Sequence, residues 1–173
     1  MLRMQDLKSR YLGELTNRLP DGVRFELYMH GRVKPGKYKA ANQNVENIQV
    51  LLEELKREYG LTYEIKDTHK MSQKAVKAAY RSSVHWIMTT KWRPFTSRKI
   101  HEIFVGGEAG DYFGKEVPAM IVYDSSYDIY CVLPHIFEGS EFHLPRKSER
   151  KTETITIYDY LSLLKKRLRA RIK

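Results

Sequence analysis

The chain has 173 residues, enough for one domain with a single sizeable core. Its residues are 42% hydrophobic, 30% charged and 12% aromatic, with only 10 Gly and 6 Pro, which excludes disordered and collagen-like classes and indicates a globular protein. The single cysteine, Cys131, excludes an intrachain disulfide framework, a Cys-x-x-Cys redox pair and a cysteine-built zinc cage. We therefore expect a reducing compartment.

The charge balance points to anionic partners. The chain has 31 Lys and Arg against 21 Asp and Glu, a net charge of +10, and such a surface attracts polyanions through counterion release. The alternative is a soluble basic protein whose charge serves no ligand. Residues 1–15 carry charges throughout and do not form a secretory signal, and the longest uncharged apolar stretch, Val117 to Tyr123, is far shorter than the ~20 residues of a membrane span. We expect a cytoplasmic protein without membrane contact.

The first half of the chain predicts two helices and two strands. Apolar residues at helical spacing predict an N-terminal helix within residues 1–20, and the alternation in 23–29 predicts a strand with one buried face. The apolar stripe in 45–59, between a capping Asn and the stop residue Gly60, predicts the second helix. Residues 61–66 alternate again and predict the second strand.

The second half predicts a helix, a hairpin and a terminal helix. Ser72 is placed to cap a third helix, with Val76 and Tyr80 facing inward and the basic residues elsewhere around the helix. Two β-prone runs, 118–123 and 129–133, predict an antiparallel hairpin. Residues 134–154 are expected to form an irregular loop. Thr156 and Asp159 form a capping box for a basic C-terminal helix in 156–173.

These elements predict an α/β fold, with α+β as the alternative, in a single domain spanning residues 1–173. The helix between the first two strands makes them parallel neighbours through a right-handed crossover. The hairpin then completes a mixed four-stranded sheet with helices on both faces.

This element order resembles that of thioredoxin-like domains, in which a βαβ unit is joined through a helix to a ββα unit. Pro118, at the entrance to the third strand, falls where that fold carries a cis-proline. The resemblance is one of element order only. The region that would hold the redox cysteines, residues 30–39, contains no cysteine, and Cys131 lies inside a predicted strand. The resemblance therefore implies no thiol chemistry.

Two basic loops are the first candidate site. They follow the first and second strands, and loops at the carboxyl ends of adjacent parallel strands share one rim of the sheet, where α/β proteins commonly bind ligands. The alternative is that exposed loops simply favour lysine. The candidate anion-binding residues are His30, Arg32, Lys34, Lys37, Lys39, His69 and Lys70.

A second basic run interleaves aromatic residues with cations. Trp92 and Arg93 belong to it, and this composition is used to stack unpaired bases while their phosphates are neutralised. The alternative is that Trp92 anchors a turn to the core. A third concentration of cations, in residues 165–173, suits the C-terminal end of a helix electrostatically.

No motif predicts a cofactor, a metal or a catalytic set. The glycine-rich segment 106–114 lacks the Gly-Lys-Ser/Thr of a phosphate-binding loop. His135, Glu138, Glu141 and His143 show no fixed ligand spacing and are interpreted as a polar surface loop.

The sequence thus favours a basic domain that binds nucleic acid, RNA or a single strand rather than duplex DNA, because no groove-reading helix motif is present. One alternative is an enzyme acting on a nucleic acid or another phosphate-bearing substrate, with His30 or His69 in the site. Another is a redox-inactive thioredoxin-like interaction subunit with an acidic protein partner. The oligomeric state stays open.

Overall fold

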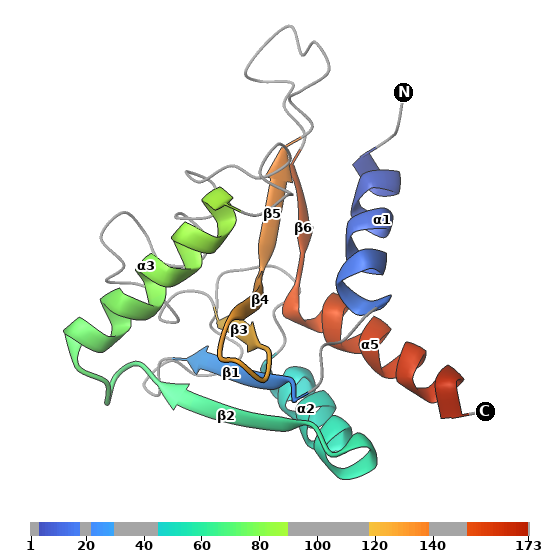
Figure 1. Cartoon of the computed structure of the whole chain (residues 1–173), viewed down its shortest axis with the longest axis horizontal. Helices are drawn as coiled ribbons and strands as arrows, with labels where there is room; N and C mark the ends of the chain where they lie inside the picture. Colours follow the sequence, from blue (N-terminus) through green and yellow to red (C-terminus); the bar gives the residue numbers. More distant parts are fainter. Residues whose placement is uncertain (1–3, 18–21, 30–44, 90–117, 139–151, 173) are drawn as a thin grey trace, which may run out of the picture.

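The computed structural model describes residues 4–17, 22–29, 45–89, 118–138 and 152–172, and the statements below concern these residues (Figure 1). The described helices are α1 (Met4–Asn17), α2 (Val45–Tyr59), α3 (Gln73–Thr89) and α5 (Ile157–Ile172). The described strands are β1 (Arg24–Met29), β2 (Thr62–Asp67), β3 (Ala119–Tyr123), β4 (Ile129–Leu133), β5 (His135–Glu138) and β6 (Thr152–Ile155).

Four strands form one mixed sheet in the order β2-β1-β3-β4. β1 and β2 are parallel, as predicted from the intervening helix, and β3 is antiparallel to both β1 and β4. The predicted α/β fold with helices on both faces of this sheet is confirmed. The order βαβ, helix, ββα is consistent with the thioredoxin-like order, although a further strand pair, β5-β6, comes before the last helix.

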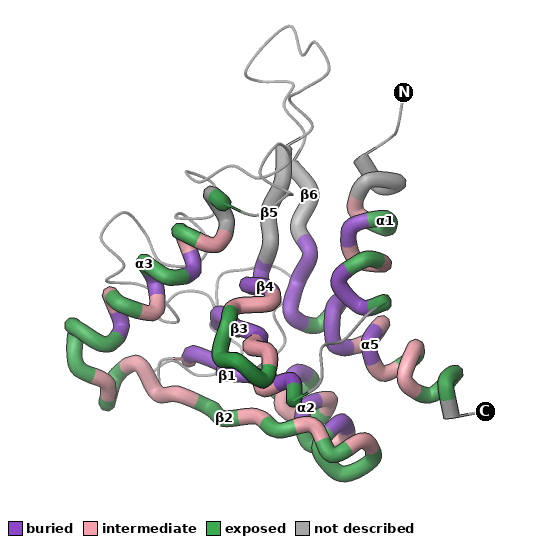
Figure 2. The backbone as a smooth tube through the Cα atoms, viewed as in Figure 1, coloured by how far each residue is buried: buried purple, intermediate pink, exposed green. Residues whose placement is uncertain are grey.

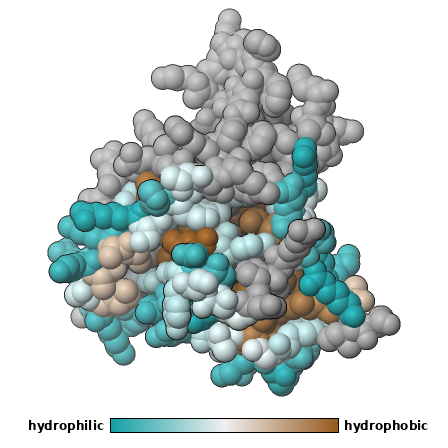
Figure 3. All heavy atoms as spheres, in the orientation of Figure 1, coloured by the Kyte–Doolittle hydropathy of each residue, from teal (hydrophilic) through white to brown (hydrophobic). Residues whose placement is uncertain are grey.

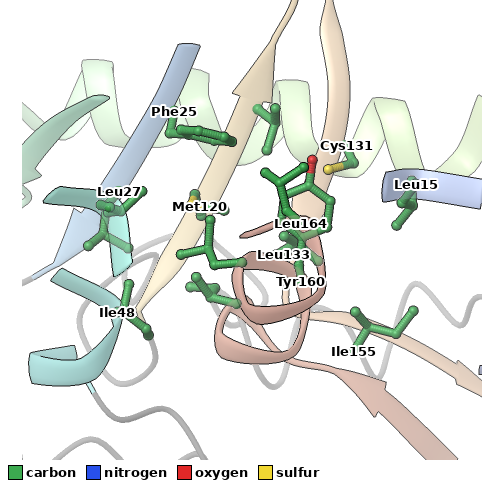
Figure 4. Packing of buried hydrophobic residues seen from close by; sticks show 14 of the residues in the cluster. Leu15, Phe25, Leu27, Ile48, Met120, Cys131, Leu133, Ile155, Tyr160 and Leu164 are labelled. Atoms are coloured by element: carbon green, nitrogen blue, oxygen red, sulfur yellow. The ribbon is translucent and has the colours of Figure 1, made fainter. Parts of the chain in front are cut away.

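One face of the sheet carries the main core. Phe25, Leu27, Met120 and Leu133 project from the strands into a cluster that α2 and α5 close with Leu52 and Leu164, all 1% exposed or less (Figure 4). α2 and α5 pack on each other, and α1 packs on α5. In Figure 1, α1 and α5 lie on the same side of the molecule, with β5 and β6 between them and α3.

α3 covers the other face. Val76 and Tyr80, four residues apart on the helix, pack with Tyr28, Ala119 and Ile121 of the sheet in a second, smaller cluster. Ser72 caps the helix as predicted, because its hydroxyl accepts a hydrogen bond from the Ala75 amide at 3.2 Å. The predicted helix stop at Gly60 is also confirmed: Gly60 adopts a φ of 68° and donates its amide to the Lys56 carbonyl.

The prediction that the first strand buries one face is wrong. Phe25 and Leu27 face the main core, but Glu26 and Tyr28, on the opposite face, are buried as well, and the tube in Figure 2 is buried along this strand. β1 lies between β2 and β3, and α3 covers its second face. A strand enclosed in this way has no solvated face, whatever its alternation suggests.

The prediction of an irregular loop over residues 134–154 is wrong at both ends. β5 and β6 pair antiparallel, with His135 opposite Ile155 and Glu138 opposite Thr152. His135 and Glu138, interpreted from the sequence as part of a polar surface loop, are therefore strand residues, while Glu141 and His143 lie outside the described residues. Ile136, Phe137 and Thr154 supply the β-branched and aromatic residues that favour this pairing.

The capping box of α5 is confirmed and is testable. The Thr156 amide donates to the Asp159 carboxylate at 3.2 Å, and the Asp159 amide donates to the Thr156 hydroxyl at 3.0 Å.

We expect Thr156→Val, which keeps the side-chain shape and removes the acceptor, to lower the free energy of unfolding by about 1 kcal/mol, and Thr156→Ser to lower it by less. Urea unfolding measures both. Ser162→Ala, inside the same helix, is the control with a change below about 0.5 kcal/mol. Equal stability of the Val and Ser variants would contradict the role of the hydroxyl.

Candidate functional site

The first candidate site lies at the edge of the sheet where β1 and β2 end, and the structure describes this edge and the turn after β2. Met29 and Asp67, the last residues of β1 and β2, are paired neighbours, so the loops that follow begin at the same edge of the sheet. The turn after β2 is held by Asp67 and the Met29 carbonyl. Thr68 donates its amide to Met29 O at 2.7 Å, and His69 donates its amide to the Asp67 carboxylate at 2.9 Å.

These bonds determine what the turn offers a ligand. The amides of Lys70 and Met71 also donate, both to the Asp67 carbonyl. The backbone donors of this turn are therefore engaged, and an anion would meet the exposed side chains of His69 and Lys70 rather than a backbone cradle. The other candidate residues, His30, Arg32, Lys34, Lys37, Lys39, Trp92 and Arg93, lie outside the described residues, so their contribution stays a prediction.

α3 continues from this turn as a basic helix. Its sequence contains no Asp or Glu, and Lys74, Lys77, Arg81 and His85 follow one another at intervals of three and four residues. Such intervals place side chains along one face of a helix. Lys74, Arg81 and His85 are exposed and Lys77 is half-buried, because the opposite face packs on the sheet. We call these four residues the basic stripe.

The basic stripe leads into a groove between α3 and the turn that joins β3 to β4. The groove is an open depression of about 560 Å³. It combines the basic side chains of Arg81 and His85 and the acidic side chain of Asp128 with two large aromatic side chains, a combination that the sequence did not bring together. Its lining residues are Arg81, Ser82, His85, Trp86, Thr89, Tyr127, Asp128 and Ile129.

The β3-β4 turn is built around Asp124. The Asp124 carboxylate accepts the amides of Ser126 at 2.8 Å and Asp128 at 3.0 Å, and its carbonyl accepts the amide of Tyr127 at 3.1 Å. This turn places Tyr127 at a φ of 62°, in the left-handed region that favours glycine and asparagine. For a tyrosine such a backbone costs about 1 to 2 kcal/mol. Tyr127 is nevertheless 68% exposed, so burial of its ring does not offset this cost.

Arg24 supports the ring of Tyr127 from below. Its guanidinium carbon lies 4.4 Å from the centroid of the Tyr127 ring and 5.1 Å from that of Tyr123, within the range of cation–π attraction. Gly22, two residues earlier, packs against this turn so closely that a Cβ atom there would lie 2.9 Å from Ser125 Cβ. The start of β1 and the turn are thereby held together.

Glu26 fixes Arg24 in place. The Arg24 guanidinium lies 3.2 Å from one Glu26 carboxylate oxygen, and the Tyr28 hydroxyl donates to the other at 2.7 Å. Lys66 lies 3.9 Å from the same carboxylate. The Glu26 side chain is only 8% exposed, and a buried carboxylate needs such partners because its desolvation is costly. Burial, followed by the hydrogen bond to Glu26, raises the pKa of Tyr28 far above its ordinary value.

The third concentration of cations is divided by the structure. Lys165 pairs with Glu54 of α2 and, through this hydrogen bond, lowers the pKa of that carboxyl, while Arg167 and Arg171 donate to Asn17 of α1. These residues join α5 to the other two helices. Lys166 and Arg169 are exposed. The face shown in the space-filling view has hydrophilic residues toward both of its sides (Figure 3). Exposed cations occur on α5 as well as on α3, so charge alone does not single out one site.

Cys131 is no candidate for thiol chemistry. It is fully buried in the main core beside Tyr160, and burial raises the pKa of its thiol far above the ordinary value (Figure 4). Among the described residues, no group of three or more His, Cys, Asp or Glu could hold a metal ion, and no described helix is both long and apolar enough to cross a membrane.

Comparison with models of known protein families, with curated proteins and with solved structures returned no match. The similarity to thioredoxin-like domains thus stays one of element order.

The buried thiol predicts a pH dependence of stability. The unfolded thiol ionises near its ordinary pKa of 9.0. The folded thiol, whose pKa is raised, keeps its proton there, so its contribution is fully present below about pH 9 and is lost as the pH rises. We expect the free energy of unfolding to fall from about pH 9 upward, with a slope that approaches about 1.4 kcal/mol per pH unit for each such group. Urea unfolding of wild type and Cys131→Ala across this range measures the slope, which should be shallower in the variant. Identical slopes would show that the thiol is not the linked group.

Proposed function

We propose that this protein binds single-stranded nucleic acid, RNA in the first place, along the basic stripe of α3. The observation that carries the proposal is that the stripe ends in a groove shared by Arg81, His85, Trp86 and Tyr127. Cations that follow a phosphate backbone, together with aromatic rings on which bases stack, are the two components of single-strand recognition. The net charge of +10 adds long-range attraction for any polyanion.

The length of α3 suits an extended ligand. Its 17 residues span about 25 Å at 1.5 Å per residue. Lys70 lies in the turn before the helix, Arg81 lies at the middle of the helix, and His85 lies nearer its other end. A flexible strand of several nucleotides is therefore long enough to contact Lys70 and the groove at once.

The stripe can be tested against charges elsewhere. We expect Lys77→Gln with Arg81→Gln to weaken binding of a mixed-sequence single-stranded RNA, and to reduce the slope of log K against log salt by about 1.4, because each lost phosphate contact removes about 0.7. Lys166→Gln with Arg169→Gln removes the same charge from exposed positions of α5 and should change the slope less. Fluorescence anisotropy across a salt series measures both, with thermal melting as the folding control.

The outcomes separate the partner classes. Equal losses from the two double variants would leave only diffuse electrostatics, and absence of binding by the wild type would overturn the proposal. Polyglutamate that binds as tightly as RNA of equal charge would indicate an acidic protein partner instead.

The predicted rim has a separate test. Removing the charges of Arg32, Lys34, Lys37 and Lys70 together should weaken binding of the same RNA and reduce the slope of log K against log salt. We expect this because the rim borders the start of α3. The fold should survive, because Lys70 is exposed and the turn around it is held by Asp67. Far-ultraviolet circular dichroism provides the folding control. Unchanged binding by this variant would remove the rim from the site and leave the groove.

A further inference from the structure

We infer that Tyr127 is a preset stacking residue, so that the groove recognises an unpaired nucleobase and not only the phosphate backbone. This inference rests on the proposed function and specifies what the groove takes. Three features of Tyr127 carry it: its backbone, its exposure and its support.

The backbone conformation of Tyr127 disfavours a tyrosine at this position, which indicates that the side chain has a role. The turn requires a φ of 62° at this position, because Asp124 holds the amides on both sides of it. Glycine or asparagine meets this requirement with less strain. Strain of this kind persists where the surrounding structure fixes it, and it gathers at binding sites.

The exposure of Tyr127 shows that the ring is not placed for the core. It is 68% exposed, whereas its neighbour on β3, Tyr123, is half-buried. The ring nevertheless lines the groove, together with Trp86 and Arg81. A large aromatic side chain that lines an open groove without being covered offers a planar apolar surface to a ligand.

The support under the ring makes it rigid. Arg24 lies 4.4 Å below the ring centroid and is itself held by the buried carboxylate of Glu26 at 3.2 Å. One face of the ring therefore contacts a fixed guanidinium, and a base can occupy the other. Because the ring is already oriented, little conformational freedom is lost on binding.

This arrangement predicts what the groove distinguishes. A single strand presents free base faces, while the bases of a duplex are already stacked on their neighbours, so the groove should favour the single strand. An abasic strand keeps every phosphate and offers nothing to the ring. Loss of affinity on removal of the bases is therefore the signature of Tyr127, whereas a change of salt slope is the signature of the basic stripe.

The experiment compares wild type, Tyr127→Gly and Tyr127→Phe for binding to a mixed-sequence single-stranded RNA and to an abasic strand of equal length. We expect Tyr127→Gly to weaken RNA binding about tenfold, equivalent to about 1.4 kcal/mol, with an unchanged salt slope. Tyr127→Phe should stay within about twofold, since the ring is retained. On the abasic strand all three proteins should bind alike, and more weakly than wild type binds RNA.

Folding is controlled within the same set. Tyr127→Gly relieves the backbone strain and should be folded by circular dichroism, and Tyr127→Asn, which also accepts a left-handed backbone, is the second variant without a ring. Wild-type binding to RNA with no loss in either ringless variant would overturn the stacking role and leave the proposed function standing. Failure of the wild type to bind any strand would instead overturn the proposed function itself.

Discussion

The burial of β1 on both faces is the constraint around which the rest of the structure is arranged. A central strand with helices on each side buries the side chains that point to either face of the sheet. On the α3 face of β1, one of these buried side chains is the charged residue Glu26. A buried carboxylate is tolerated only when it is paired and hydrogen-bonded. Arg24, Tyr28 and Lys66 meet this requirement from the same strand and from its neighbour β2.

The ion pair between Glu26 and Arg24 also fixes the β3-β4 turn, outside the sheet. Arg24, held by Glu26, lies under the ring of Tyr127, and Gly22 brings the start of β1 against the same turn. The position of the groove thus depends on a chain of contacts that begins in the core. A change at Glu26 would leave the charge of Arg24 without its buried partner, which is why Glu26 is a poor site at which to test the groove and Tyr127 is a better one.

How far the sequence predicted the structure depends on whether the determining contacts are local. The α2 stripe, the Ser72 cap and the capping box of Thr156 and Asp159 involve residues within one or two helical turns, and they were predictable from spacing. The second buried face of β1 depends on α3, and the β5-β6 pair joins segments on either side of residues 139–151, so neither follows from a local pattern. The groove was missed for the same reason, since Arg81 and Tyr127 come from different parts of the chain. Its one local signal is a tyrosine in the turn Asp-Ser-Ser-Tyr-Asp, where glycine or asparagine is usual.

The two faces of the sheet separate the main core from the surface that we propose binds nucleic acid. Cys131 and Tyr160 belong to the face closed by α2 and α5, where the larger of the two buried clusters lies, and this face provides most of the burial on which folding depends. The ionic network, the basic stripe and the groove lie on the α3 side, where the second cluster is small. Cys131 is enclosed in this core, where burial raises the pKa of its thiol, so it is not placed for the thiol chemistry of a thioredoxin-like domain. Because the basic stripe lies on the α3 side, replacement of its exposed residues should alter binding without disturbing the main core, and this separation makes the proposed function accessible to mutation.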